Sequence, residues 1–327
     1  MIKSKDISIV VQGPIYETTD ETINNLREFF PDAEIIVSTW EGSDYKNDKA
    51  DIITESKDPG GHPLWDEPVI LNACNRQIVS TVAGLNKATR KYAMKIRSDM
   101  YFKHTNFLRH WGKYNKRCDK YKILDDRILI STSFAPNPRR GEAKPFHPSD
   151  WFFFGLTSDL IKVFDSPLCP EPETSRYFET HKRPRVRYDF WYPAYCQYSA
   201  EQYIWVAFCK RFIPDLNFEH CFDIEKGNID KSELVFANNT VMLNSIDIGY
   251  DSYKRINHHD TCDLAFMYSH HEWLKLYQKY CDKFAFIPLV DREKIRRVML
   301  AFKYKRQIKF NIRALFNYIP KKTVEWE

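Results

Sequence analysis

The first candidate for chemistry is a carboxylate, Asp99, at the end of an apolar run in residues 91–102. The run also contains Lys95 and Arg97 and is typical of a buried strand. Ligands of open α/β sheets bind beyond the carboxyl ends of the strands, so we expect Lys95, Arg97, Ser98 and Asp99 where a nucleotide diphosphate would lie. Asp99 could hold a divalent metal there, or it could pair with Arg97 or cap a turn.

Other strand ends supply further candidates for nucleotide contacts. The apolar run 6–11 is followed by Gln12, Gly13 and Pro14, and the run 33–40 ends at Trp40. A glycine lets the backbone approach a base or ribose, and an aromatic ring can stack on one, although Trp40 fits a core position equally well. Arg76, on the helix expected before the Asp99 strand, could neutralise a diphosphate.

Two carboxylates are candidates for a general base. Ser199 is the predicted N-cap of a helix whose first turn holds Glu201. Glu201 could take a proton from an acceptor hydroxyl, or it could only complement the helix dipole. Asp150 precedes the aromatic run 151–155, which could hold a sugar ring, so Asp150 could contact the acceptor or bond the local backbone. Glu201 is the preferred base.

The histidines give a weaker signal for metal binding. Residues 258–260 and 270–272 each combine two histidines with an acid. Adjacent side chains on a helix point about 100° apart, so we expect most of these histidines to be structural. His220 or His259 could still complete a metal site with Asp99.

Composition excludes several classes of protein. A chain of 327 residues can bury a large core, and its eight scattered cysteines contain no Cys-x-x-Cys pair, which favours reduced thiols over a structural zinc site. The chain opens on polar residues, and no run approaches the ~18 apolar residues of a membrane span, so we expect a cytoplasmic protein. The sequence contains no Gly-rich phosphate loop of the P-loop or dinucleotide-binding type, so it does not support an ATPase or a dehydrogenase.

The positive charge is concentrated near the end of the chain. Residues 291–322 hold 11 Lys or Arg and two acids, although the net charge of the whole chain is only +5. Apolar residues recur there at helical spacing, which predicts a basic amphipathic helical tail in residues 291–327. The tail could lie on the anionic inner face of the cytoplasmic membrane, or pack on the core with a solvated basic face. Residues 1–290 are not basic, so we expect no nucleic acid partner.

The elements that must position these residues alternate between strand and helix. Apolar, β-branched runs predict strands at 6–11, 33–40, 50–55 and 91–99, and helical spacing predicts helices near 19–30 and 72–88. This order indicates an α/β fold with a mostly parallel sheet covered by helices. We expect a nucleotide-binding half in residues 1–105, an acceptor half in 106–290 and the tail in 291–327.

Six motifs resemble, in the same order, the bacterial WavE-type lipopolysaccharide-synthesis proteins: VVQGPIY (10–16), EIIVSTWEGSD (34–44), DPG (58–60), NRQIVSTVAGL (75–85), KIRSD (95–99) and FHPSDWF (146–152). The resemblance spans roughly residues 6–205. It implies a GT-A-like, Rossmann-type glycosyltransferase that uses a nucleotide-sugar donor. The implied acceptor is lipopolysaccharide, capsule or a related surface glycan. The implied reaction inverts the anomeric carbon with the help of a carboxylate base.

One departure from the GT-A pattern concerns the metal. The usual Asp-x-Asp motif is here Arg97-Ser98-Asp99, so a requirement for Mn²⁺ or Mg²⁺ is open and Arg97 could neutralise part of the charge instead. The missing carboxylate suggests one alternative, a catalytically inactive sugar-binding or scaffold protein of a glycan assembly complex. A second alternative, within enzymes, is a transferase of a nucleotide-activated alditol phosphate.

Overall fold

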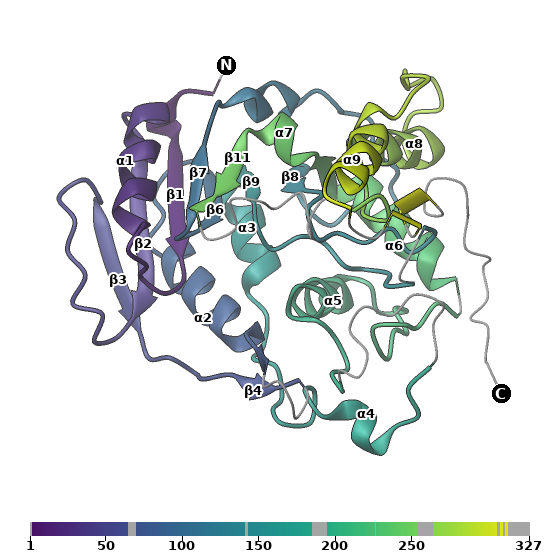
Figure 1. The fold of residues 1–327 in the computed structure, drawn as a ribbon, viewed down its shortest axis with the longest axis horizontal. Coiled ribbons are helices and arrows are strands. Elements are labelled where there is room, and N and C mark those ends of the chain that lie inside the picture. Colours follow the sequence, from purple (N-terminus) through teal and green to yellow (C-terminus); the bar gives the residue numbers. More distant parts are fainter. Residues whose placement is uncertain are drawn as a thin grey trace.

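The centre of the fold is a seven-stranded sheet (Figure 1). A computed structural model describes residues 2–64, 70–140, 143–184, 195–225, 227–253, 264–305, 308–309 and 311–312. In spatial order the strands are β10 (Thr240–Leu243), β8 (Ile128–Ser131), β9 (Phe153–Leu156), β6 (Tyr92–Arg97), β1 (Ile7–Gln12), β2 (Glu34–Trp40) and β3 (Ile52–Ser56). The predicted α/β fold with a mostly parallel sheet is confirmed.

The direction of one strand decides where the site forms. β1 runs parallel to β2 and β6, β2 to β3, and β8 to β10, whereas β9 is antiparallel to both β6 and β8. Lys95 of β6 pairs with Phe153 at the start of β9. The residues just before β9, including Asp150, therefore lie at the same edge as the residues just after β6, including Asp99.

Helices cover the sheet and connect its strands. The longer ones are α1 (Thr19–Phe29), α2 (Cys74–Leu85), α3 (Thr157–Phe164), α5 (Ala200–Phe212), α6 (Asn228–Asn239), α8 (His270–Tyr280) and α9 (Arg292–Lys303). Short elements are η1 (Ser4–Asp6), η2 (Asn106–His110), α4 (Tyr177–Thr180), α7 (Ser245–Ile248) and two ribbons, β4 (His62–Pro63) with β5 (Leu71–Asn72) and β7 (Met100–Phe102) with β11 (Tyr250–Ser252). Figure 1 shows α1 and α2 toward the β3 side and α8 and α9 at the opposite side.

Helix α2 lies unusually close to the sheet. A Cβ atom added at Gly84 would come 2.3 Å from Val10 Cγ1 on β1 and 3.1 Å from Ser38 Cβ on β2. Only glycine allows this approach without displacement of the helix. The depth of α2 against β1 fixes the position of its first turn, which carries Arg76 and Gln77.

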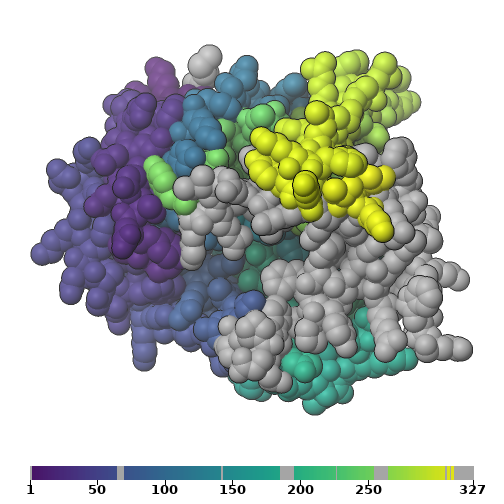
Figure 2. Space-filling model, in the orientation of Figure 1, coloured from purple at the N-terminus to yellow at the C-terminus, as the bar shows by residue number. Residues whose placement is uncertain are grey.

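The described part of the basic tail is a helix, α9, which packs on the protein. Its buried face is charged, which differs from the expectation of a helix packed on the core with a solvated basic face. Its charged residues Glu293, Lys294 and Arg297 are buried against the protein, whereas Ile295, Met299 and Phe302 point outward. The physical reason is that this region of the core offers carbonyl and carboxylate acceptors to Lys294 and Arg297. Figure 2 shows α9 in yellow on one face of the molecule.

Membrane-spanning helices and disulfide bonds were the subject of two further expectations. No described helix has both the length and the apolar character that crossing a bilayer requires. No described cysteine forms a disulfide.

Candidate functional site

A polar cavity of about 360 Å³ opens at the carboxyl ends of β1, β2 and β6. It brings together nearly all of the residues that the sequence predicts for nucleotide binding, and Lys95 is the exception. Its lining comprises Gln12, Gly13, Pro14, Tyr16, Trp40, Asp58, Ala73, Arg76, Gln77, Arg97, Ser98, Asp99 and Asp150. Trp40 therefore borders the cavity, as the stacking alternative requires.

Hydrogen bonds hold the floor of the polar cavity in place. Gly13 has a φ of +121° that favours glycine, and its N–H donates to the Ser38 carbonyl at 3.0 Å. The Ser98 hydroxyl donates to the Pro14 carbonyl at 2.6 Å, and the Ser80 hydroxyl donates to Gln12 Oε1 at 2.7 Å. The ends of β1 and β6 are thus tied together before any ligand binds.

Asp99 forms the ion pair with Arg97 that was one of its two expected roles. Arg97 Nε lies 3.0 Å from Asp99 Oδ1 and Arg97 Nη2 lies 3.2 Å from Oδ2, which also accepts from the Ser252 hydroxyl at 3.2 Å. Burial disfavours the charge on Arg97, but the Asp99 and Asp150 carboxylates outweigh it and raise the pKa of Arg97. The arginine therefore stays cationic at the cavity wall.

Among the described residues, those around Asp99 do not offer the set of ligands that a divalent metal needs. The Asp99 side chain is fully buried, and both of its oxygens already accept hydrogen bonds. A hard cation needs several oxygen ligands, and the described residues contain no cluster of three His, Cys, Asp or Glu side chains. His220 packs instead against Phe178, and His259 lies outside the described residues.

A second arginine on the cavity wall is held by an aspartate to which the sequence analysis assigned no role. Arg76 Nε and Nη2 donate to Asp58 Oδ1 and Oδ2 at 2.8 and 2.7 Å. The hydrogen bond from Arg76 lowers the pKa of Asp58, although partial burial opposes the shift. Asp58 belongs to the DPG motif, so its position in that motif was the available signal.

An adjoining cavity of about 160 Å³ holds the preferred base, Glu201. The two cavities share Ala73 and Gln77 in their walls. Gln77 Nε2 donates to Asp150 Oδ2 at 3.1 Å, so Asp150 faces the polar cavity while Glu201 faces the adjoining one. The adjoining cavity is lined by Leu64, Ile70, Leu71, Asn72, Ala73, Gln77, Lys144, Arg183, Cys196, Ser199, Ala200, Glu201, Cys221 and Phe222.

The ionisable groups between the two cavities shift one another's pKa values. Desolvation, and then the charge of Asp150, raises the pKa of Glu201 to about 7. Burial lowers the pKa of Lys95 to about 8, and its ammonium group donates to the backbone carbonyl of Asp150. A carboxyl group with a pKa near neutrality can accept a proton efficiently at physiological pH.

A histidine that was not among the predicted site residues, His147, contacts the N-cap of the helix that carries Glu201. His147 Nε2 lies 2.8 Å from Ser199 Oγ, and its Nδ1 lies 3.0 Å from the Pro148 carbonyl. Burial lowers the pKa of His147 to about 3, so the ring is neutral; Nδ1–H donates to the carbonyl and Nε2 accepts from Ser199. Ser199 is the predicted N-cap of α5 and accepts from Gln202 N at 3.4 Å.

One sequence-based interpretation is wrong. The aromatic side chains of residues 151–154 are buried in the hydrophobic core and line neither cavity, so they do not form an exposed wall for a sugar ring. Trp151 still acts on the site indirectly, because the Arg97 guanidinium stacks over its ring at 5.0 Å.

Comparisons with known proteins agree with this architecture. The model of a protein family described as WavE lipopolysaccharide synthesis matches residues 7–308. No curated protein matches the chain. The matched segment includes every residue of both cavities.

Proposed function

This chain belongs to the WavE lipopolysaccharide synthesis family, and from that membership we propose that it is a glycosyltransferase. The enzyme moves a sugar from a nucleotide-sugar donor to a bacterial surface glycan. The observation that carries the proposal is the pair of adjoining cavities, one with two arginines in its wall and the other with a carboxyl group whose pKa lies near neutrality.

The polar cavity is the proposed donor site. Arg76 and Arg97 use Nε and Nη2 to hold Asp58 and Asp99, which leaves the Nη1 group of each, among the described residues, as a donor for diphosphate oxygens. Trp40 offers a ring for stacking against the base, and Gly13 allows close approach of the backbone. Lys95 and Ser98 hold the strand end beneath the phosphates.

The adjoining cavity is the proposed acceptor site, with Glu201 as the base. The acceptor hydroxyl oxygen bonds to the anomeric carbon while its proton passes to Glu201. The bond between the anomeric carbon and the phosphate oxygen breaks, and its electron pair leaves with the nucleotide diphosphate, whose charge Arg76 and Arg97 stabilise. The displacement inverts the anomeric centre. Asp150, bonded to Gln77 between the cavities, orients the donor sugar.

We propose that the arginines take the place of a metal in this reaction. The expectation of Mn²⁺ or Mg²⁺ is tested by measuring nucleotide affinity with and without each ion. Nucleotide affinity that does not change with the ion supports charge neutralisation by Arg76 and Arg97. Metal-dependent binding that is lost in Asp99→Ala would instead assign the diphosphate to a metal at Asp99.

The first experiment is calorimetric titration of the full chain with nucleoside diphosphates and nucleotide sugars. We compare the wild type with Arg76→Ala and with Arg90→Ala, a matched loss of an exposed arginine outside both cavities. Loss of the charged hydrogen bonds predicts roughly tenfold or greater weakening in Arg76→Ala only. Equal affinity in the two variants would refute the assigned donor site.

The two alternatives predict different products. A scaffold protein would bind a sugar or glycan without consuming any nucleotide sugar, so complete absence of donor cleavage would favour it over a transferase. An alditol-phosphate transferase would place phosphorus in the product, because attack then falls on phosphorus rather than on carbon. Mass spectrometry of the product separates that reaction from sugar transfer.

A further inference from the structure

The outward face of α9 carries large apolar side chains among exposed cations, which is unusual for a helix at a protein surface. Ile295, Met299 and Phe302 are 47 %, 66 % and 51 % exposed and follow one another at spacings of four and three, so they share one face. The opposite face, with Glu293, Arg297 and Ala301, is buried. A stable surface helix normally has the reverse polarity.

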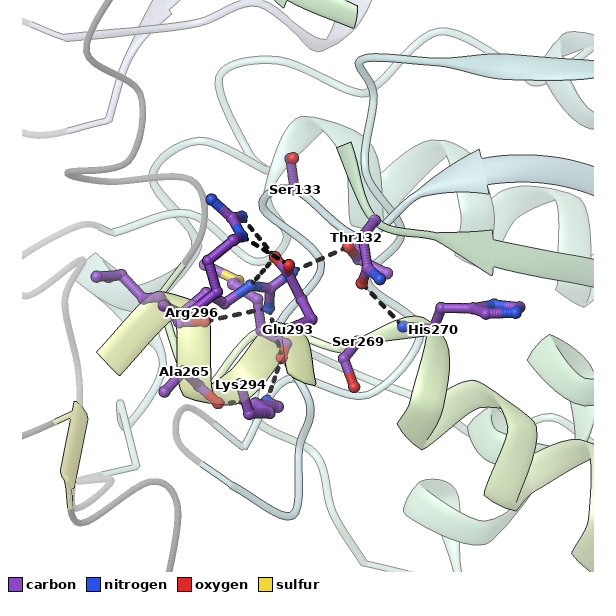
Figure 3. A network of polar contacts seen from close by, with 12 residues as sticks. Thr132, Ser133, Ala265, Ser269, His270, Glu293, Lys294 and Arg296 are labelled. Carbon is purple, nitrogen blue, oxygen red and sulfur yellow. Dashed lines mark hydrogen bonds and ion pairs between the residues drawn. The ribbon is translucent and has the colours of Figure 1, made fainter. Parts of the chain in front are cut away.

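The buried face is fixed by specific polar contacts (Figure 3). Arg297 donates to the Tyr268 carbonyl at 2.9 Å, to Thr132 Oγ1 at 3.1 Å and to Glu293 Oε1 at 2.8 Å. Lys294 donates to the Met267 carbonyl at 2.5 Å and pairs with Glu272 at 3.1 Å. Rotating the helix to hide its exposed apolar side chains would remove the contacts of Arg297 and Lys294 with Tyr268, Thr132, Met267 and Glu272, so these contacts hold the helix in its observed orientation.

The segment before α9 is also rich in exposed apolar side chains. Phe284, Phe286, Leu289 and Val290 are all exposed, so seven of the twelve exposed large apolar side chains in the described residues lie between positions 284 and 302. Exposed apolar residues gathered in this way mark an interaction site. We call this surface the α9 surface; it comprises Phe284, Phe286, Leu289, Val290, Ile295, Met299 and Phe302.

The charges around the α9 surface identify its partner. From Lys283 to Lys305, every exposed ionisable side chain is basic: Lys283, Arg292, Lys303 and Lys305. Asp291 is bonded to Ser269 and to the Lys294 backbone, and Glu293 is buried. Apolar side chains among exposed cations match an anionic lipid bilayer, where the former enter the headgroup region and the latter meet lipid phosphates. The same like charges oppose the approach of a second copy.

We propose that the α9 surface docks the protein on an anionic membrane. The inward face of the helix holds it on the protein, and the outward face inserts into the headgroup layer. This inference goes beyond the proposed transfer reaction and does not depend on it, since no residue of the α9 surface lines either cavity.

The test is flotation of the full chain with vesicles of phosphatidylethanolamine, with and without phosphatidylglycerol. The variant Leu289→Ser/Met299→Ser/Phe302→Ser removes apolar side chains that are already exposed, so the fold should persist. The control Leu168→Ser/Phe212→Ser/Ile246→Ser removes three exposed apolar side chains outside the α9 surface. We expect the wild type and the control to float with phosphatidylglycerol vesicles. The α9 variant should bind these vesicles at least roughly tenfold more weakly.

Four outcomes would overturn the proposal. They are absence of wild-type binding, equal binding by the α9 variant, a wild-type dimer in sedimentation that the α9 variant makes monomeric, and binding that appears only after deletion of residues 313–327. The third would assign the surface to a second copy, and the fourth to the chain's own end. Nucleotide binding without vesicles, measured in parallel, reports separately on the proposed transferase.

Discussion

Two buried lysines, Lys95 beside the cavities and Lys294 under α9, have similar protonation energetics but different surroundings. Burial lowers the pKa of each to about 8. Lys294 lies 3.1 Å from the Glu272 carboxylate, which also pairs with Arg140 at 2.9 Å. Lys95 donates to a backbone carbonyl, and none of the described carboxylates lies within ion-pair distance of its ammonium group.

The glutamates near these lysines differ in the same way. Burial would raise the pKa of Glu272, but Lys294 and Arg140 outweigh it and the pKa falls. Desolvation and Asp150 instead raise the pKa of Glu201. Lys294, Glu272 and Arg140 form a closed cluster, the α9 network, that stabilises the fold. The cluster of Lys95, Asp150 and Glu201 at the cavities instead keeps a carboxyl group ready to accept a proton. A shifted pKa indicates function only where the group also faces a cavity.

Replacing Glu201 by Gln should have the largest effect on activity and should not impair folding. The amide keeps the shape of the side chain but cannot accept the acceptor proton, so we expect kcat to fall about 10²- to 10⁴-fold. Sugar transfer under saturating donor and acceptor measures the loss. Glu55→Gln, at an exposed position on β3, is the control. A Glu201→Gln enzyme with full turnover would remove the proposed distinction between the two clusters.

Replacing Lys294 by Met should destabilise the protein without changing the chemistry. The change leaves Glu272 buried with only Arg140 as a cationic partner, and breaking a buried pair costs roughly 3 kcal/mol or more. Chemical denaturation gives the free energy of unfolding, with exposed Lys303→Ala expected to change it by less than about 0.5 kcal/mol. If Lys294→Met changes stability no more than Lys303→Ala, the α9 network does not stabilise the fold.

The pH dependence should report Glu201. Because its base form is required, kcat/KM should rise about tenfold per pH unit up to the pKa of about 7 and then level off, and Glu201→Gln should abolish this rise. The pKa of Glu201 in the folded protein is above its ordinary value of 4.5, so the favourable contribution of protonated Glu201 to stability is present below pH 4.5 and is lost as the pH rises through 7. The stability advantage of the Gln variant should therefore grow with pH, and a constant difference would contradict the shifted pKa.

Replacing Lys95 by Met should cost less stability than replacing Lys294 by Met. The side chain lies near the Phe153 and Phe164 rings, so an apolar replacement is accommodated, and loss of one hydrogen bond to the Asp150 carbonyl costs about 1 kcal/mol. Loss of its positive charge raises the pKa of Glu201 further, because Lys95 now lowers it. The rise of kcat/KM should shift to higher pH. An unshifted profile would show that the two groups are not coupled.

The sequence predicted best what adjacent residues determine. Strands β1, β2 and β6 were predicted because each is an apolar run buried on both faces, and Ser199 was predicted as an N-cap because capping is a local preference. The polar cavity followed from the rule that ligands bind at the carboxyl ends of such strands.

Contacts between distant residues could not be predicted in the same way. The pairing of Arg76 with Asp58 and of His147 with Ser199 depends on tertiary approach, as does the reversal of β9 that brings Asp150 beside Arg97. The periodicity of α9 defined its two faces but not which of them would be buried. That was decided by the Tyr268 and Met267 carbonyls and by Glu272, all remote from α9 in the sequence.

The close approach at Gly84 has a genetic consequence. An alanine there would force α2 away from Val10 and Ser38 and shift the first turn, which carries Arg76 of the polar cavity and Gln77 of the wall shared by both cavities. The displaced helix would destabilise the fold and distort the donor site. The protein would tolerate this strain better at low temperature, where its free energy of unfolding is larger than near the midpoint of thermal unfolding. Gly84→Ala is therefore a rational starting point for a temperature-sensitive allele, with which this protein could be switched off in a growing cell.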